Sequence, residues 1–233
     1  MKCLIFDIWG TYGHFRKAYT TTSPLTYSIP TRTALSGLIA AILGLERDSY
    51  YELLNTENSL FAVRIINPIK KIRLNLNIIK TDIGFFLQDI SGSPRAPTPY
   101  ELIKDPHYRI YCWLKDEEAY KKLEVNLKQH LCTFTLYFGI SELIANFAYI
   151  DALDMALKEA IKPEFIHSVV IKDGLEVIVE ENKRYASEII PIEMDSQRKV
   201  LKYSNIIYET SGKPLLIKEG KFYEVGNENV AFF

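Results

Sequence analysis

Cationic and aromatic side chains are concentrated in a short segment near the start of the chain, within residues 8–45. A loop that only turns the chain rarely carries so many donors, cations and rings together. Cations neutralise phosphates, and exposed rings stack on unstacked bases. The segment therefore predicts contact with a single-stranded nucleic acid, through the side chains of His14, Arg16, Lys17, Tyr19 and Arg32.

Further cations occur in two later places. Lys71 and Arg73 follow a proline, and the alternation of a strand would place both on one face. A solvated edge strand that is kept from aggregating by its charge would explain these two equally well. Arg95 lies among prolines, where it could stack on a base, bind a phosphate through two nitrogens, or be an exposed loop residue without a specific partner. Lys104 and Arg109 lie at the base of the same proline-rich segment.

Signatures of catalysis are scarce. The chain lacks the common nucleotide-binding, zinc-protease and serine-hydrolase motifs, and its four histidines do not have the spacing of metal ligands. We therefore expect no metal and no other cofactor. His14 could act as a general base in an RNA-cleaving site, but we interpret it as a donor that positions RNA.

The composition indicates a globular protein with an uneven charge distribution. The chain has 233 residues, of which 48% are hydrophobic, and its net charge is −1. Residues 1–115 carry 14 Lys and Arg against 9 Asp and Glu, whereas residues 116–233 carry 14 against 20. A basic half beside an acidic half suggests that one face meets an anion, although chance would also explain the asymmetry.

The compartment is predicted from the cysteines and the N-terminus. The three cysteines form no CxxC pair, which favours free thiols in a reducing environment. An acid at Asp7 comes too early for a secretory signal, and no apolar segment is long enough to span a membrane. The sequence therefore predicts a cytoplasmic protein without a membrane contact.

The spacing of apolar residues predicts a first domain over residues 1–147. Residues 3–9 form the apolar run typical of a central strand that is buried on both faces. A helix follows, with Thr31 or Thr33 as its N-cap and Gly44 just beyond its end. The further elements that we expect are a strand over residues 59–79 with a bend near Asn67-Pro68, an arm over residues 80–107, a strand over 108–114, a helix over 116–129 and a strand over 133–138. This order is that of a ferredoxin-like or RNA-recognition-motif (RRM) domain with an inserted hairpin.

Residues 148–233 predict a smaller, mostly β region, which follows a short helical turn that ends at Asn146. The dipeptides Asp173-Gly174 and Glu219-Gly220 are tight-turn signals between pairs of short strands. We expect those strands over residues 165–172, 176–180, 188–192, 205–209, 215–218 and 221–225. The predicted fold class is therefore α+β: a ferredoxin-like, RRM-type domain with a thumb-like hairpin, followed by a β region.

Several of these segments, in this order, resemble the Cas-five branch of the repeat-associated RNA-binding proteins (the RAMP superfamily), the CRISPR Cascade subunit that holds the 5′ end of the guide RNA. Near the N-terminus the resemblance rests on His14-Phe15-Arg16, on Thr22-Ser23-Pro24-Leu25-Thr26-Tyr27, and on a helix start at Pro30-Thr31-Arg32-Thr33-Ala34. Further along it is carried by residues 99–111, 136–142, 190–192 with Arg198, and 207–209. Members of the subtype I-B-like group look most similar.

The resemblance implies a modified RRM fold whose arm acts as a thumb against the guide RNA and the neighbouring backbone subunit. By position, residues 13–16, the helix start at Arg32 and Thr33, and the arm around Arg95 would cradle the 5′ repeat-derived handle of the CRISPR RNA (crRNA). N–H groups at a helix N-terminus and cations suit its phosphates, and rings suit its splayed bases. The implied partners are crRNA and the backbone and large subunits of Cascade, and a contact with target DNA stays open.

The resemblance also leaves an alternative. The subtype I-C branch has a similar fold but cleaves the precursor RNA with a Tyr and an adjacent Lys-His dyad. This chain has no adjacent Lys-His, and its nearest arrangement is Lys104 with His107. We therefore favour a non-catalytic subunit. A metal-independent endoribonuclease using His14, Lys104 and His107 is the second hypothesis, and an unrelated ferredoxin-like module for a small ligand is the third.

Overall fold

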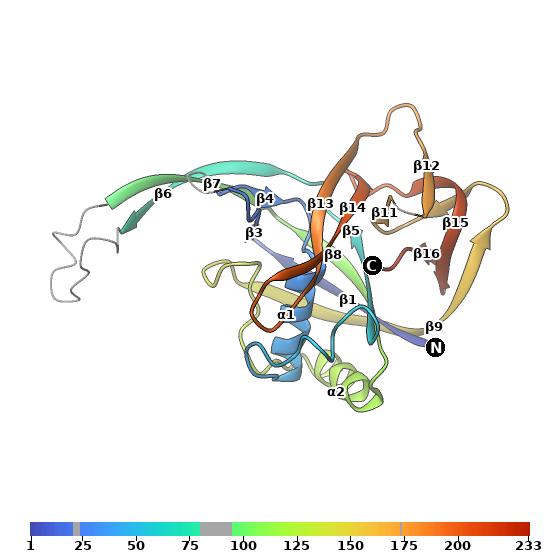
Figure 1. Cartoon of the computed structure of the whole chain (residues 1–233), viewed down its shortest axis with the longest axis horizontal. Helices are drawn as coiled ribbons and strands as arrows, with labels where there is room; N and C mark the ends of the chain where they lie inside the picture. The colour runs from blue at the N-terminus through green and yellow to red at the C-terminus, as the bar shows by residue number, and fades with distance from the viewer. Residues whose placement is uncertain (21–23, 80–94, 173) are drawn as a thin grey trace.

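The computed structural model describes residues 1–20, 24–79, 95–172 and 174–233. It is mostly β, and two helices, α1 (Arg32–Leu43) and α2 (Glu117–Lys128), pack on one face of a curled antiparallel sheet (Figure 1). The strands are β1 (Lys2–Gly10), β2 (Tyr12–Gly13), β3 (Phe15–Arg16), β4 (Thr26–Tyr27), β5 (Ser59–Ile65), β6 (Lys71–Ile79), β7 (Arg95–Lys104), β8 (His107–Leu114), β9 (Ala145–Ala160), β10 (Glu164–Ile166), β11 (Val170–Ile171), β12 (Leu175–Ile178), β13 (Tyr185–Met194), β14 (Val200–Glu209), β15 (Leu215–Val225) and β16 (Glu228–Val230).

Strand β1 is the centre of the large sheet, as its apolar run predicts. It pairs with β8 on one side and β9 on the other, and the strand order along the sheet is β10-β15-β9-β1-β8-β5. Leu4, Phe6 and Ile8 face the helices, whereas Cys3 and Ile5 face the C-terminal strands. Because both faces are covered, every residue of β1 from Cys3 to Ile8 is buried.

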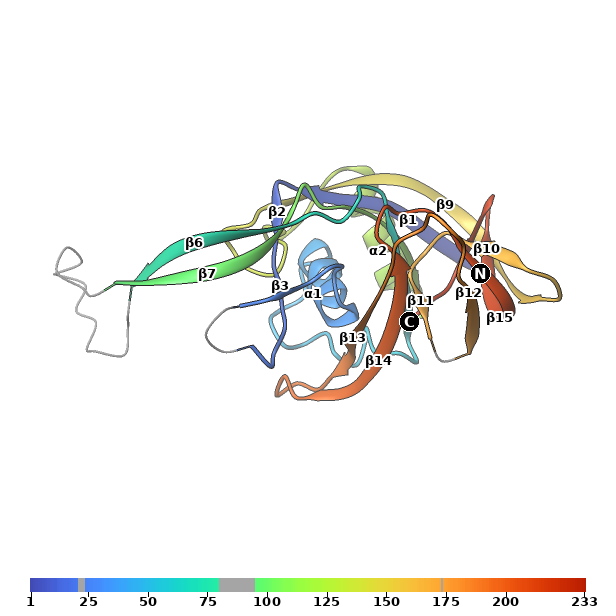
Figure 2. The same ribbon diagram turned by 90° about the horizontal axis from the view of Figure 1, so that it is seen from above.

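Both helices begin and end where the sequence predicts. The Thr31 hydroxyl accepts a hydrogen bond from the Ala34 N–H, and Gly44 ends α1 in the left-handed region, with φ of +70°. Asp116 caps α2 in the same way. Helix α1 lies between the large sheet and the β13–β14 hairpin, which explains why it is apolar on nearly every side (Figure 2).

The predicted strand over residues 133–138 is wrong. This segment is a loop that forms only an isolated bridge from Tyr137 to Ile144, and β9 takes the place beside β1. Phe138 is fully buried, whereas Phe134 and Tyr137 are nearly half exposed, so single side chains fill gaps without strand pairing. Gly139 then turns the chain at φ of +89°, where an added Cβ would lie 1.9 Å from the His14 carbonyl oxygen.

Strand β9 is much longer than the sequence suggests. The predicted helical turn that ends at Asn146 is wrong, because residues 145–160 form one strand. Its first part pairs with β1 and its last part, from Met155 onward, pairs with β15. The predicted boundary between residues 147 and 148 therefore lies inside a strand that belongs to both parts of the chain.

The C-terminal strands are partly regrouped. The predicted turn at Glu219-Gly220 is wrong, because β15 continues through both residues. Gly220 has a φ of +126°, a backbone conformation that glycine adopts readily because it has no Cβ. The predicted strand over residues 165–172 divides into β10, which pairs with β15, and β11, which pairs with β14. Asp173 of the other predicted turn lies outside the described residues.

Strands β6 and β7, called the arm from here on, form a hairpin that projects from the body (Figures 1 and 2). The predicted strand over residues 59–79 is divided into β5 and β6, so the arm starts at Lys71 and includes part of what was expected to be the sheet. Residues 80–94 of the predicted arm lie outside the described residues. At its base β7 also pairs with β2, which gives the order β2-β7-β6.

Candidate nucleic-acid interface

Arg32, a predicted phosphate contact, is instead buried. Only 1% of its surface is exposed, and its guanidinium donates to the carbonyl oxygens of Leu54, Asn55, Ser59 and Phe233 at 2.8–3.0 Å. It also donates to the Ser59 hydroxyl at 2.7 Å. With its donors occupied inside the protein, Arg32 has nothing to offer a phosphate.

The environment of Arg32 explains how a buried cation is tolerated. Burial lowers its pKa to about 10, and the carboxylate of Glu193 opposes the shift. The side chain therefore keeps its charge at neutral pH, and its guanidinium lies 4.8 Å from the centre of the Phe61 ring. Thr33 is the next residue of α1, and its hydroxyl lies 3.0 Å from that of Thr31. The Thr31 hydroxyl also accepts from the Ala34 N–H, so the cap of the helix is made by the protein itself.

We predict that Arg32→Met destabilises the fold by about 3 kcal/mol or more, because it leaves several buried acceptors without a donor. Urea unfolding measures the change. Arg47→Met, at an exposed side chain after α1, is the control and should alter stability by less than about 0.5 kcal/mol. A fully stable Arg32→Met chain with weakened RNA binding would restore the phosphate role.

Lys17 and Lys71 belong to an ion-pair cluster with Glu101 and Glu188, called the Glu188 cluster here. Lys17 Nζ lies 2.8 Å from Glu188 Oε1, and Lys71 Nζ lies 3.5 Å from both Glu188 Oε1 and Glu101 Oε1. Lys71 also donates to the carbonyl of Thr26 at 2.9 Å. These two lysines therefore join the N-terminal loop, the arm and β13, which is a positioning role and a correction to their predicted contact with RNA.

Glu188 is the acceptor at the centre of this cluster, and only a tenth of its side chain is exposed. Burial raises the pKa of its carboxyl, but hydrogen bonds from Lys17 and the Ser28 N–H, together with the charge of Lys71, outweigh burial and lower the pKa overall. The sequence offered no signal for Glu188, because its partners lie about 120 to 170 positions away.

We predict that Glu188→Gln costs about 3 kcal/mol of stability at pH 7 because it leaves partly buried lysines without their carboxylate. A carboxyl with a lowered folded pKa stabilises the protein above its ordinary pKa of 4.5 and loses this effect as the pH falls through the lowered value. The gap between the variant and the unmodified chain should therefore shrink below pH 4.5 in urea unfolding. Exposed Glu181→Gln should show no such gap, and a pH-independent gap would contradict the role of the charge.

His14 is buried as well. Its Nδ1–H donates to the carbonyl of Glu101 at 2.8 Å, and its ring lies 5.2 Å from that of Tyr100. Burial lowers the pKa of the imidazole, so the ring is neutral at pH 7. The side chain therefore fixes the base of β7 against the N-terminal loop, and the predicted contact of His14 with RNA is corrected to a structural one.

The other two residues of the predicted cleavage set lie apart from His14. His107 Nε2 lies 3.2 Å from Asp7 Oδ2, and Arg109 makes bonds of 2.8 and 3.2 Å to the same carboxylate, on the sheet face opposite the helices. Lys104 is exposed at the base of the arm. In the part of the chain that the structure describes, no hydrogen bond or ion pair joins His14, Lys104 and His107. The predicted RNA contact of Arg109 is likewise replaced by an ion pair.

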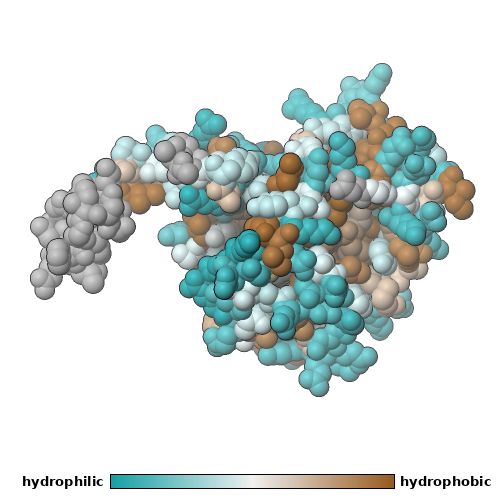
Figure 3. Space-filling view, in the orientation of Figure 1, coloured by the Kyte–Doolittle hydropathy of each residue, from teal (hydrophilic) through white to brown (hydrophobic). Residues whose placement is uncertain are grey.

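The arm has a polar and an apolar face, because side chains alternate along its paired strands. Arg73 and Arg95 are both exposed and share the polar face, whereas Lys104 has the opposite parity. The polar face consists of Lys71, Arg73, Asn75, Asn77, Arg95, Pro97, Pro99 and Glu101. The apolar face consists of Ile72, Leu74, Leu76, Ile78, Ala96, Thr98, Tyr100 and Leu102. Brown, hydrophobic residues are visible on the arm beside the grey segment in Figure 3.

A pair of exposed rings lies near the Glu188 cluster. Tyr19 is 72% exposed and Tyr203, on β14, is 54% exposed. Burial raises the pKa of the Tyr27 hydroxyl, and the charges of the Tyr19 and Tyr203 phenols raise it further. Tyr203 was not among the predicted contacts, and its only signal in the sequence is its alternation with Ser204 and Ile206, which are buried on β14. Arg16 is exposed in the same loop as Tyr19 and donates to the Thr20 carbonyl at 3.2 Å.

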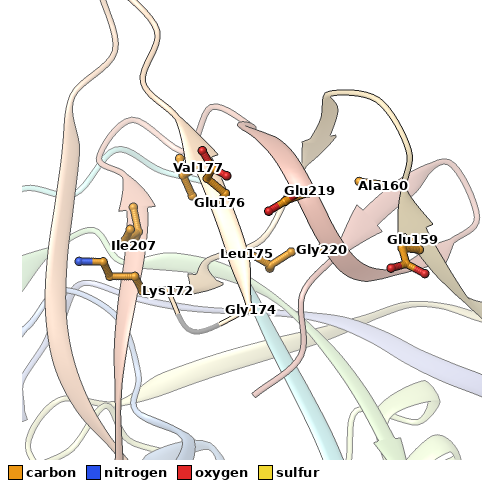
Figure 4. Close-up of a pocket in the computed structure, with 10 residues that line it drawn as sticks. All are labelled: Glu159, Ala160, Lys172, Gly174, Leu175, Glu176, Val177, Ile207, Glu219 and Gly220. Carbon is orange, nitrogen blue, oxygen red and sulfur yellow. The ribbon is translucent and has the colours of Figure 1, made fainter.

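A cleft of about 710 Å³ lies elsewhere, among the C-terminal strands (Figure 4). It is lined by residues of β9, β12, β14 and β15 and by Lys172; three glutamates, Glu159, Glu176 and Glu219, are among them, and none of the predicted site residues is. Among the described residues, no group of His, Cys, Asp and Glu is arranged to hold a metal ion. Within the same residues, neither helix has the length and apolar composition to cross a bilayer.

Comparison with known proteins identifies the family. The family model of the CRISPR-associated protein (Cas_Cas5) matches residues 3–206, so the chain belongs to that family. A solved CRISPR protein from Archaeoglobus fulgidus is similar over 99% of this chain and 98% of its own, with a TM-score of 0.60 and 19% identity. A chain of a CRISPR RNA-guided surveillance complex is similar over 91% of both chains, with a TM-score of 0.53 and 13% identity. No curated protein matches the chain.

Proposed function

We propose that this protein is a non-catalytic RNA-binding subunit of a type I CRISPR effector, or Cascade, complex, in which it holds the 5′ repeat-derived handle of the crRNA. The observation that carries the proposal is membership of the family over residues 3–206. A structurally similar chain comes from an RNA-guided surveillance complex, which supports an assembly of the same kind.

The fold fits this role. The chain order β1-α1-β5-β8-α2-β9 and the strand order β9-β1-β8-β5 are interpreted as a ferredoxin-like, RRM-type core, with the arm as its thumb. On this interpretation the arm replaces the direct connection between β5 and β8. Its polar face would lie along the handle, and the backbone and large subunits of the complex would contact the protein around it.

The exposed groups suit a single strand better than a duplex. Arg16, Arg73 and Arg95 can neutralise phosphates, and Tyr19 and Tyr203 offer rings on which unpaired bases stack. The absence of catalysis is supported by the separation of His14, Lys104 and His107, since a general base must reach the 2′-hydroxyl that it activates. Arg32 and Lys17 hold this surface in place, and Lys71, at the base of the polar face, is engaged by Glu101 and Glu188.

We predict that Arg16→Ala, Arg73→Ala and Arg95→Ala each weaken binding of labelled repeat RNA and lower the slope of log affinity against log salt by about 0.7, as the loss of one phosphate contact on a single strand requires. Titration in a gel-shift assay between low and moderate salt measures both quantities.

The control for these variants is Lys121→Ala, at an exposed lysine of α2 on the body of the protein. It should leave affinity and slope unchanged. The same gels, run with EDTA, report cleavage: intact RNA supports a binding subunit, whereas site-specific cutting that His107→Ala abolishes would favour the endoribonuclease. Unchanged slopes in all three arginine variants would refute the assigned surface.

We predict that Tyr19→Ala and Tyr203→Ala each weaken RNA binding by roughly tenfold, in line with stacking energies of about 1–3 kcal/mol per base. The matched variants Tyr19→Phe and Tyr203→Phe keep the ring and should bind normally. Fluorescence anisotropy with single-stranded handle RNA measures the four affinities. Equal losses in the Ala and Phe variants would mean that the hydroxyls, and not stacking, make the contact.

A further inference from the structure

The two outer edges of the arm, one on β6 and one on β7, differ in the backbone groups that they leave available for pairing. In the order β2-β7-β6, strand β6 is the last strand, and β7 has the body of the protein beside it. Every strand at a sheet edge presents unpaired backbone N–H and C=O groups, which proteins usually cover or block. The edge of β7 lacks donors at two of its outward positions, whereas within the described residues the edge of β6 is uncovered.

The edge of β7 is closed by prolines at alternate positions. Glu101 N–H donates to the Pro24 carbonyl at 3.1 Å, so odd-numbered residues of β7 direct their backbone N–H away from β6. Pro97 and Pro99 share this parity and have no N–H to present. At residues 97 and 99 the outward side of β7 therefore has no backbone donor.

The register shows which groups of β6 face outward. Leu74 pairs with Tyr100 and Leu76 with Thr98. The backbone N–H and C=O groups of these even-numbered residues point toward β7. The Lys104 N–H donates to the Lys70 carbonyl, which confirms the same parity. Alternation then directs the backbone N–H and C=O groups of Arg73, Asn75 and Asn77 to the outer edge. Among the described residues, none of these three has a backbone partner on that side.

In the large sheet, by contrast, the edge strand β5 is covered by other segments of the chain. Its last strand, β5, receives a hydrogen bond at the Phe61 carbonyl from the Phe233 N–H, and another at the Val63 carbonyl from the Val169 N–H, at 2.9 and 2.8 Å. C-terminal segments thus lie along β5. No described segment does this for β6, although both strands come from the same part of the chain.

The sequence of β6 gives its open edge a tendency to pair with other chains, which would favour aggregation of an isolated protein. Residues 74–78 carry no charge and no proline, and Leu74, Leu76 and Ile78 are 38%, 38% and 39% exposed on the apolar face. An uncharged, apolar edge strand is a template for pairing with another chain. A hairpin of two strands is also only marginally stable until something packs against it.

We propose that the edge of β6 binds an extended segment of a neighbouring protein subunit, which adds a strand to the arm by β-augmentation. The proposal rests on the proposed function for the presence of such a subunit. A polypeptide supplies alternating donors and acceptors for the outward groups of Arg73, Asn75 and Asn77. RNA phosphates accept but do not donate, so they cannot satisfy the carbonyl groups of the edge.

The apolar face would add specificity to this pairing. Side chains of an added strand alternate between the two faces, and those on the apolar face would lie beside Leu74, Leu76 and Ile78. The polar face, with Arg73 and Arg95, stays available to RNA. One hairpin can therefore bind RNA with a face and protein with an edge at the same time.

The test uses a variant that copies the closed edge of β7 onto β6. Asn75→Pro with Asn77→Pro removes two outward N–H groups and leaves the even-numbered pairing positions intact. Asn75→Ala with Asn77→Ala is the matched control, because both variants lack the amide side chains and differ only at the backbone. Each chain, tagged, is purified with its complex from the native host, and hydrogen exchange of the arm is compared with that of the isolated chain.

We expect the amides of residues 73, 75 and 77 to exchange at least tenfold more slowly in the complex of the unmodified chain than in the isolated chain. In the alanine variant, the amide of residue 73 should be protected in the complex to the same extent as in the unmodified chain. The proline variant should lose this protection and should release the partner roughly tenfold more readily. Protection at Leu74 and Leu76 in the isolated proline variant verifies that its arm is folded.

Three results would overturn the proposal: equal exchange in the complex and the isolated chain, equal retention of the partner by the proline and alanine variants, or a chain that purifies without another protein. Dimerisation of the isolated chain that the proline variant abolishes would also overturn it, in favour of a second copy. Failure of the proposed function gives a different result: RNA affinity and its salt dependence would be unchanged when Arg16, Arg73 or Arg95 is replaced by alanine.

Discussion

The arrangement of the exposed surface depends on one buried carboxylate. Glu188 on β13 accepts from Lys17 and from the Ser28 N–H and lies 3.5 Å from Lys71, so three segments from the first third of the chain meet on a strand from the last third. Two lysines and a backbone donor repay the cost of burying this charge. These contacts tie the base of the arm and the Tyr19 loop to the β13–β14 hairpin, which also packs on α1 through apolar side chains.

The sequence predicts best what is decided locally. The cap of α1 at Thr31, the extent of α2, the central position of β1, and the existence of a projecting hairpin were all readable from short patterns. Register and length were less readable. Residues 133–138 have the composition of a strand, but Gly139 must turn against the His14 carbonyl, and no local pattern reveals that contact. Strand β9 carries exposed charges along its second half, which disguises it as a loop.

The candidate site was predicted by residue type, and type does not reveal burial. Arg32 and His14 have donors that suit RNA, yet one is satisfied by carbonyls from residues 54–59 and 233 and the other by Glu101. Their partners are 22 to 201 positions away, beyond the reach of any spacing rule. Arg16, Tyr19, Arg73 and Arg95 remain on the surface. Tyr203, exposed on β14, lies 184 positions from Tyr19, so no local pattern links the two rings.

The continuity of β9 has a mechanical consequence. Since one strand is paired to β1 at its start and to β15 at its end, the N-terminal core and the C-terminal strands cannot pivot about a linker. Any relative rotation must bend the ribbon itself and break hydrogen bonds along it. A displacement of the C-terminal strands would therefore be transmitted to β1, at the centre of the core, through the unbroken backbone of β9.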